Sequence, residues 1–162
     1  LADIGRLDQV SRGVYTLPEV WEDEFVSIQE RYKRGVFALD TALFLHDLTD
    51  RTPHKFHMAF PYGYNTSSPK AAGILCSCKK EPYYSLGIAL VDTPAGNTVR
   101  AYNAEKTLCE ILKPISHTDI QIITDAFKRY AGRKDKNIPL LSEYAHQLRV
   151  EKRLRPYLEV LL

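Results

Sequence analysis

The chain has 162 residues, of which 44% are hydrophobic and 26% are charged, and its formal net charge at pH 7 is +2. These values are ordinary for a folded protein and argue against a disordered chain. The apolar runs are far shorter than the ~20 residues that cross a bilayer, and no signal peptide is recognisable. We therefore expect a cytoplasmic protein with no membrane partner and with its three cysteines as free thiols. Because the chain begins at Leu1 and its only methionine is Met58, we also expect further residues upstream.

A β-hairpin is predicted over residues 1–16. Its first arm ends near Leu7, its turn covers residues 8–11, and its second arm returns over residues 13–16. A two-stranded ribbon is only marginally stable alone in water, so we expect its packing partner to precede the given sequence.

A helix is predicted next, because Thr16 and Glu19 have capping-box spacing and Pro18 lies in the first turn. Charged side chains occupy one face of this helix, which we interpret as a surface exposed to solvent. Apolar residues recur at helical spacing on the other face, at Trp21, Phe25, Ile28 and Tyr32.

Residues 36–62 form the segment around which we expect the rest of the chain to pack. Asp40 or Thr41 can cap a helix over residues 40–48, whose apolar residues cover most of its circumference. Residues 55–60 then alternate in polarity, which predicts a half-buried strand. The inward residues of this strand are Phe56, Met58 and Phe60.

Three further strands complete a predicted sheet of four. Residues 65–72 are predicted to form a loop, and the alternation over residues 73–79 predicts the second strand. Residues 86–92 and 98–102 flank a short loop with proline and glycine, a pattern typical of a β-hairpin.

The C-terminal third is predicted to be helical. Asn103 can cap a helix that stops before Pro114, and Thr118 or Asp119 can start another that ends at Gly132. The predicted inward face of this second helix consists of Ile120, Ile123, Phe127 and Tyr130.

Two more helices are predicted, one beginning near Pro139 and a final one beginning at Arg155 and Pro156. The first of them should turn four residues inward, namely Leu141, Tyr144, Ala145 and Leu148. The whole pattern predicts an α+β fold, in which a hairpin is followed by a mixed domain with a helical C-terminal third.

No familiar catalytic or cofactor-binding motif occurs in the sequence, and no phosphate-binding glycine loop is present. Cys76, Cys78 and Cys109 lack the two closely spaced pairs of a structural zinc site, and we interpret them as small apolar side chains. His46 and His57 have no recognisable nucleophile or orienting carboxylate beside them, so we interpret them as structural or surface residues. We therefore predict no enzyme activity, no cofactor and no bound metal.

Two alternatives from other functional classes remain. Asp47, Asp50 and Asp92 could form the acidic set of a metal-dependent nuclease, although the carboxylates and lysine of such sites are not closely paired here. We interpret them as caps and turn residues. A pure protein-interaction module is the other alternative, and it would have no affinity for DNA.

Four short motifs occur in order between Arg12 and Leu108, and the elements that carry them extend over nearly the whole chain. They are Arg12-Gly13-Val14-Tyr15, Thr41-Ala42-Leu43-x-x-His46-x-Leu48-Thr49, Phe56-His57-Met58-Ala59-Phe60-Pro61 and Ala104-Glu105-Lys106-Thr107-Leu108. Their order and spacing resemble the AbiEi family, the antitoxin components of bacterial AbiE abortive-infection systems. One departure is Lys106-Thr107-Leu108-Cys109-Glu110, where the family usually has Arg-Thr-Leu-x-Asp; the charge signs are kept.

This resemblance implies a type IV antitoxin for phage defence, which counteracts a nucleotidyltransferase-like toxin without forming a stable complex with it. It also implies a transcriptional regulator that represses its own operon by binding inverted repeats in promoter DNA through a winged helix-turn-helix. Residues 1–16 are then the wing hairpin of an incomplete N-terminal domain, and residues 17–162 are the C-terminal antitoxin domain.

Basic residues are concentrated near the C-terminus, where residues 128–155 hold nine Lys or Arg against three acidic residues, a net +6. One interpretation is a positive patch that contacts DNA or RNA, and the other is an ordinary solvated surface. In the wing, Arg6 and Arg12 flank the turn and are predicted to contact DNA phosphates. The predicted contacts of the C-terminal third are Arg133, Lys134, Lys136, Arg149, Lys152, Arg153 and Arg155.

Overall fold

A computed structural model describes residues 8–11, 14–16 and 23–161, and it has the expected α+β fold. Its main sheet has five strands in the order β5-β4-β3-β7-β6. The pairs β3–β4 and β6–β7 are antiparallel, and the pairs β4–β5 and β3–β7 are parallel. The strands are β3 (Val36–Phe37), β4 (His57–Pro61), β5 (Leu75–Lys79), β6 (Ile88–Asp92) and β7 (Thr98–Tyr102).

The expected number of four strands was therefore wrong by one. The missed strand, β3, has only two residues, too few to show any alternation of polarity. It nevertheless lies at the centre of the sheet, where Val36 and Phe37 are fully buried.

The hairpin near the N-terminus is present, but its strands differ from the expected ones. Strand β1 (Asp8–Ser11) pairs in antiparallel fashion with β2 (Val14–Thr16), so the residues expected to turn form the first arm.

The predicted helix start at Thr16 was also wrong, because Thr16 belongs to β2. Helix α1 (Glu24–Arg31) begins later, capped by the Asp23 side chain, which accepts hydrogen bonds from the backbone N–H groups of Phe25 and Val26. Trp21, which was expected in this helix, lies outside the described residues.

Helix α2 (Leu39–Leu45) is central and buried, as expected, but neither predicted cap is used. Ala38 occupies the N-cap position without any side-chain hydrogen bond to the helix. The Thr41 hydroxyl instead accepts a hydrogen bond from the His57 N–H at 2.9 Å, which ties α2 to the start of β4.

Strand β4 is buried on both faces, whereas the sequence predicted a half-buried strand. Met58 and Phe60 face one apolar cluster, and Ala59 belongs to a second cluster on the opposite face. The strands β3 and β5 cover its two edges, and the two apolar clusters cover its faces at Met58, Ala59 and Phe60. Residues 65–72, expected to form a loop, contain the short helix α3 (Ser67–Ala71).

The C-terminal third is helical as predicted, and two of the expected caps are confirmed. Asn103 and Asp119 accept hydrogen bonds at the starts of α4 and α5. Ile120, expected on the inward face of α5, is instead 62% exposed. The elements of this third are α4 (Ala104–Ile111), the short 3-10 turn η1 (Pro114–Ser116), α5 (Ile120–Ala131), α6 (Ile138–Leu148) and α7 (Glu151–Leu161).

The last two helices differ in how well they were predicted. The four residues expected to turn inward from α6 are all buried. The final helix, however, begins at Glu151, and Pro156 lies inside it rather than at its start. The first turn of α7 is closed by the Leu154 N–H, which donates to the Val150 carbonyl.

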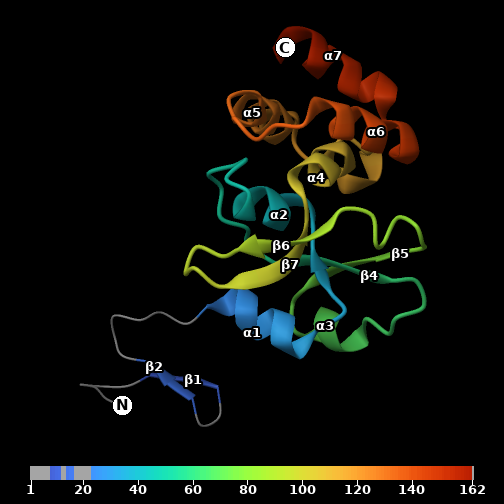
Figure 1. The fold of residues 1–162 in the computed structure, drawn as a ribbon. Helices are drawn as coiled ribbons and strands as arrows, with labels where there is room; N and C mark the ends of the chain where they lie inside the picture. Colours follow the sequence, from blue (N-terminus) through green and yellow to red (C-terminus); the bar gives the residue numbers. More distant parts are fainter. Residues whose placement is uncertain (1–7, 12–13, 17–22, 162) are drawn as a thin grey trace.

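Figure 1 shows the layers of the molecule: α1 and α3 lie on one side of the sheet, α2 and α4 on the other, and α5 to α7 stack beyond α4. The largest apolar cluster lies among α2, α4, α5, α6 and α7, and a second lies between α1 and the sheet. None of the described helices combines the length and the apolar character needed to cross a membrane.

Candidate nucleic-acid interface

The structure separates the predicted basic residues of the C-terminal third into two groups. Three of them precede α6 and four follow it, and an 11-residue helix spans about 16 Å at 1.5 Å per residue. The expected single patch is thus two groups, at opposite ends of α6. The group before α6 is Arg133, Lys134 and Lys136, and the group after it is Arg149, Lys152, Arg153 and Arg155.

The second group owes its arrangement to one backbone reversal. Arg149 ends α6 with φ of +60°, a left-handed conformation, and its N–H donates to the Ala145 and His146 carbonyls. The following N–H, of Val150, donates back to the Ala145 carbonyl at 2.9 Å. This pair of bonds is a typical helix C-terminal cap, and it lets α7 start only two residues after Arg149.

Around this reversal lies an open surface hollow, which we call the α6–α7 hollow. Arg149, Lys152 and Arg153 are exposed around it, and the only carboxylate in its lining is that of Glu151. His146 Nδ1 lies 3.2 Å from Glu151 Oε2, so these two side chains pair with each other. Three cationic side chains therefore face one open space. The residues lining the hollow are His146, Arg149, Val150, Glu151, Lys152 and Arg153.

Buried side chains fix the hollow to the helical core. Leu148, Val150 and Leu154 are each at most 4% exposed and belong to the largest apolar cluster. Further along α7, the Tyr157 ring stacks on Phe127 of α5 with the ring centroids 4.5 Å apart. The basic side chains are therefore carried by a packed corner of the fold rather than by a loop. Arg155 lies beside a neighbouring hollow, together with Ser142 and Leu158.

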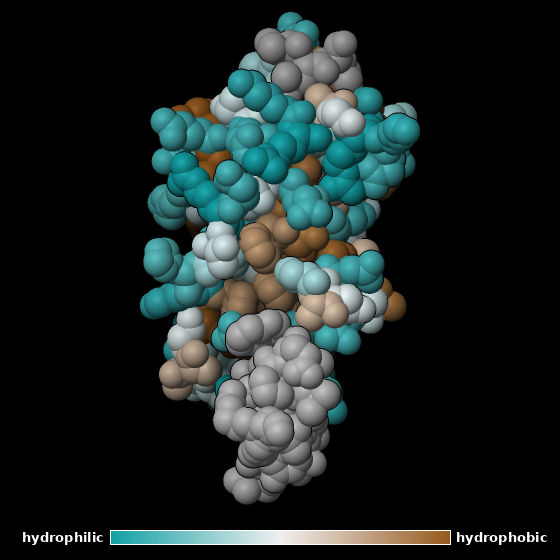
Figure 2. All heavy atoms as spheres, turned by 90° about the vertical axis from the view of Figure 1, so that its left-hand side faces the viewer, coloured by the Kyte–Doolittle hydropathy of each residue, from teal (hydrophilic) through white to brown (hydrophobic). Residues whose placement is uncertain are grey.

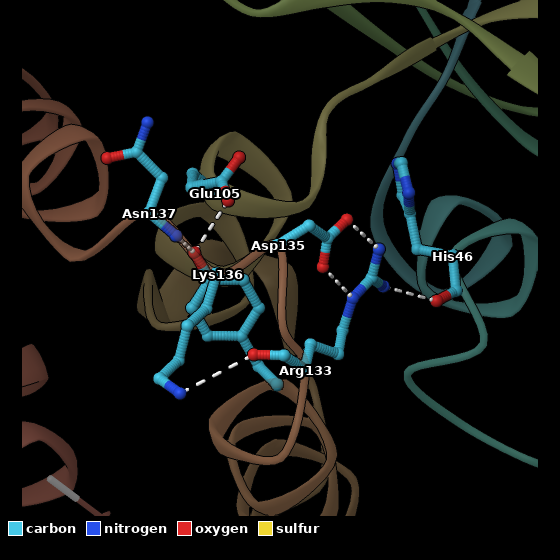
Figure 3. A network of polar contacts seen from close by, with 7 residues as sticks. His46, Glu105, Arg133, Asp135, Lys136 and Asn137 are labelled. Atoms are coloured by element: carbon cyan, nitrogen blue, oxygen red, sulfur yellow. Dashed lines mark hydrogen bonds and ion pairs between the residues drawn. The ribbon is translucent and has the colours of Figure 1, made fainter.

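Arg133, in the first group, is bound within the protein (Figure 3). Its Nε and Nη2 atoms each lie 2.9 Å from a carboxylate oxygen of Asp135, and its Nη1 donates to the His46 carbonyl at 2.7 Å. The hydrogen bonds to Asp135 raise the pKa of Arg133, and the same contact lowers the pKa of Asp135. Arg133 thus holds the α5–α6 connection against the end of α2, and its charge is largely neutralised.

The two lysines of the first group differ from Arg133. Lys136 Nζ donates to the Arg133 carbonyl at 3.4 Å, a long hydrogen bond that leaves most of the ammonium group in solvent. Lys134 is exposed and makes no hydrogen bond or ion pair with the described residues. Arg6 and Arg12, the predicted wing contacts, lie outside the described part of the chain.

The two histidines singled out in the sequence have structural contacts. His46 ends α2, and its Nε2 lies 2.8 Å from the Tyr102 carbonyl at the end of β7. Burial lowers the pKa of His46, so its neutral ring carries a proton on Nε2 for this bond. His57 Nε2 lies 3.4 Å from the Ser77 hydroxyl on the neighbouring strand, and its pKa is lowered to about 4 by burial and by Lys79.

The cysteines and carboxylates do not converge on a metal site in the described residues. Cys109 is buried and its thiol donates to the Leu141 carbonyl, while Cys78 is exposed and Cys76 is half-buried. No group of three His, Cys, Asp or Glu side chains within the described ranges could hold a metal ion.

Helix α4 holds polar residues whose burial the sequence did not indicate. Lys106 is fully buried, and its Nζ donates to the carbonyls of Tyr83 and Leu86 at 2.7 and 2.8 Å. Glu110, 3% exposed, forms an ion pair of 2.8 Å with Lys79 of β5. Three of the eight helical positions are charged, yet all eight are buried, which only the tertiary structure shows.

No protein-family model and no curated protein sequence matches this chain.

Proposed function

We propose that this chain is the antitoxin of a type IV toxin-antitoxin system, which counteracts a nucleotidyltransferase-like toxin and represses its own operon by binding promoter DNA. The proposal rests on the resemblance to the AbiEi family, in which the antitoxin is not an enzyme. The observation that supports it is the way the quoted motifs contact one another in the fold.

Three of the four motifs lie within the described residues, and hydrogen bonds join the second motif to the third and to the strand residue just before the fourth. The Thr41 hydroxyl of the second motif accepts the N–H of His57 in the third. His46, also in the second motif, bonds the carbonyl of Tyr102, two residues before the fourth motif. Residues distant in sequence thus act as one structural unit, which supports a resemblance that depends on their order and spacing.

A role in DNA binding is supported by the α6–α7 hollow. Contacts between lysine or arginine and phosphate supply the affinity of DNA binding that does not depend on sequence. Arg149, Lys152 and Arg153 are suited to such contacts because they are exposed, close together and carried by a packed corner. In this proposal the residues upstream select the operator, and the wing and the hollow add attraction to its backbone.

The test is a variant of the full-length protein with Arg149→Gln, Lys152→Gln and Arg153→Gln. We expect it to bind a duplex of its own promoter more weakly than the parent, most of all at low salt. The slope of log affinity against log salt should fall by about 0.9 for each phosphate that the protein no longer neutralises, or roughly 2 to 3 in all. Fluorescence anisotropy at several salt concentrations measures both quantities.

The matched control replaces three exposed basic residues on other elements, with Arg51→Gln, Lys33→Gln and Lys70→Gln. This variant removes the same net charge as the first. If the hollow is the contact, the control should keep the salt slope of the parent, because its three residues lie outside the hollow. Equal slopes for the two variants would contradict the role of the hollow. Co-expression with a nucleotidyltransferase-like protein encoded beside this chain tests the antitoxin activity separately. Failure to restore growth, or the absence of such a gene, would contradict it.

The nuclease alternative gains no support from the described residues. Asp47 and Asp92 line one hollow, but Asp50 lies 3.9 Å from Arg129 and is directed toward α5. The three carboxylates expected for that alternative are therefore not assembled around one point.

A further inference from the structure

Strand β6 forms one end of the main sheet and pairs only with β7 among the described strands. The residue opposite Leu90 is Arg100, and its hydrogen bond shows which way the free backbone groups of β6 point. The Arg100 N–H donates to Gln29 Oε1 at 2.6 Å, away from β6, so Leu90 and Arg100 do not exchange backbone hydrogen bonds. Hydrogen-bonded and non-hydrogen-bonded pairs alternate along an antiparallel ladder. The N–H and C=O groups of Leu90 and Asp92 therefore point away from β7, to the open edge.

The side chains of this edge do not protect it from pairing. Natural edge strands commonly carry lysine, proline or a bulge, which discourages the addition of another strand. Strand β6 has no lysine, proline or bulge and carries one charged residue, Asp92 at its end; its register with β7 is regular over five residues, and Leu90 at its middle is 75% exposed. The opposite edge strand, β5, by contrast ends with Lys79.

A hollow lies beside this edge, between β6, the end of α2 and the α5–α6 connection. We call it the α2–β6 hollow, and its apolar part lies in the region where Figure 2 shows hydrophobic surface in the middle of the molecule. The apolar residues that line it are Phe44, Leu45, Ala89, Leu90, Val91 and Pro94.

The polar lining of the α2–β6 hollow is acidic. It has three carboxylates, those of Asp47, Asp92 and Asp135. Arg133 is the one basic residue that lines it, and two hydrogen bonds pair its charge with that of Asp135, so Asp47 and Asp92 give the hollow its net negative charge. His46 is neutral because burial lowers its pKa. An occupant that carries positive charge is therefore favoured.

We propose that β6 is a docking site for an extended segment of a partner protein that alternates apolar and basic side chains. The segment adds a strand to the sheet through the outward backbone groups of Leu90 and Asp92. Alternate residues of a strand point to opposite faces, so Leu90 and Asp92 share one face of β6, and Val91 lies on the other with Phe44 and Leu45 of α2. The apolar side chains of the segment pack on the face of Val91. Its lysines or arginines lie on the face of Leu90, where their carbon chains cover Leu90 and their charges are attracted to Asp92 and to Asp47 of the same hollow. A second copy of this chain is disfavoured, because it would bring two acidic hollows together.

The probe is an acetylated and amidated eight-residue peptide of alternating valine and lysine. Amide hydrogen exchange, followed by NMR, reports whether a strand has been added. We expect the peptide to slow exchange at Leu90 and Asp92, whose N–H groups face outward, while Ala89 and Val91 stay protected by β7 as before. Weaker binding at high salt should accompany this pattern.

Two controls make the test specific. A peptide of alternating valine and glutamate has the same strand propensity, and the double variant Asp47→Asn, Asp92→Asn keeps the edge but removes two charges. We expect the acidic peptide not to bind and the variant to bind the basic peptide about tenfold more weakly or worse, with an unchanged spectrum elsewhere. Equal binding of both peptides, or no protection at Leu90 at millimolar peptide, would overturn the proposal. Protection of Leu90 that rises with protein concentration without peptide would also overturn it, in favour of self-association.

Discussion

The ammonium nitrogen of Lys106 lies 3.6 Å from the centroid of the Tyr102 ring. This cation–π contact is one of three interactions that hold the buried charge, together with hydrogen bonds to the carbonyls of Tyr83 and Leu86. The Tyr102 hydroxyl in turn donates to the Tyr84 carbonyl at 2.7 Å. Helix α4 and strand β7 are thereby joined to the connection that leads into β6.

Lys106 is predicted to make the stability of the protein rise with pH. Burial lowers its pKa to about 8, and Lys79 and Lys113 add to this effect. Between pH 8 and the ordinary value of 10.5 the unfolded chain therefore binds more protons at Lys106 than the folded chain does. The contribution of this residue to the free energy of unfolding is lowest below pH 8 and rises above it, by up to about 3 kcal/mol in all.

Urea unfolding of the parent and of Lys106→Met at pH 7.5, 9 and 10 measures this effect. The free energy of unfolding of the parent minus that of the variant should increase with pH, since methionine has no proton to lose. Other groups that titrate in the same range contribute equally to both proteins, so the difference cancels them. One such group is Cys109, whose pKa is raised by burial. Parallel curves for the two proteins would show that Lys106 does not titrate in this window.

Gly87 is predicted to be intolerant of any side chain. Its φ is +82°, and a Cβ atom would lie 2.8 Å from the Lys106 Cβ. Gly96 has a similar φ of +91° but has no atom within 4 Å of such a Cβ, so it is the matched control. We expect Gly96→Ala to lower the free energy of unfolding by about 1 to 2 kcal/mol from backbone strain, and Gly87→Ala by about 1 to 3 kcal/mol more from overpacking. Equal losses in thermal or urea unfolding would contradict the close approach.

The sequence predicted best where local chemistry alone determines the structure. Asn103 and Asp119 cap helices because their short side chains bond N–H groups two or three residues ahead, and the inward face of α6 follows from its helical spacing. Thr41 and Asp40 had the same capping capacity, but Ala38 takes the cap position and the Thr41 hydroxyl bonds His57 instead. A tertiary contact thus displaced a local preference.

The parts of the site that were not predicted depend on contacts distant in sequence. The burial of Lys106 requires carbonyls some twenty residues earlier, and its charge gave no sign of them. Arg133 was expected to face nucleic acid, yet its best partners are Asp135 and the His46 carbonyl, which the fold brings to it. The α6–α7 hollow depends on the left-handed conformation of Arg149, which few residues other than glycine adopt and which the sequence did not suggest.

His57 is predicted to make the protein less stable in acid. Its pKa is lowered to about 4 from the ordinary 6.5, mainly by burial, so between these values the unfolded chain binds more protons at this ring. Stability due to His57 is therefore complete above pH 6.5 and is lost as the pH falls toward 4, by up to about 3 kcal/mol.

The test compares His57→Gln with His54→Gln, whose side chain is exposed in the parent. Unfolding free energies at pH 7, 5.5 and 4.5 should fall less steeply for His57→Gln than for the parent. The control variant should follow the parent curve. If His57→Gln and His54→Gln had the same dependence on pH, burial of the His57 ring would not be the cause of acid sensitivity.

The hydroxyl of Tyr130 is predicted to contribute more to stability than that of Tyr144. It donates to Glu105 Oε2 at 2.6 Å and accepts the N–H of Asn137 at 2.6 Å, so it joins α4, α5 and the start of α6 (Figure 3). Both Tyr130 and Glu105 are at most 8% exposed, and removal of the hydroxyl leaves a buried carboxylate without this donor. We expect Tyr130→Phe to lower the free energy of unfolding by about 3 kcal/mol, because hydrogen bonds to charged groups contribute about 1.5 to 3 and an unpaired N–H adds its own cost.

Tyr144→Phe is the matched control for this loss. Its hydroxyl accepts one hydrogen bond of 3.2 Å from the neutral Asn103 amide, and the ring is buried like that of Tyr130. The same single-atom change should therefore cost only about 1 kcal/mol. Urea unfolding at pH 7 measures both variants, and the double variant Tyr130→Phe, Glu105→Gln should recover part of the loss, since it leaves no charge without its donor. A cost for Tyr130→Phe no larger than that for Tyr144→Phe would mean that water satisfies Glu105 and Asn137 equally well.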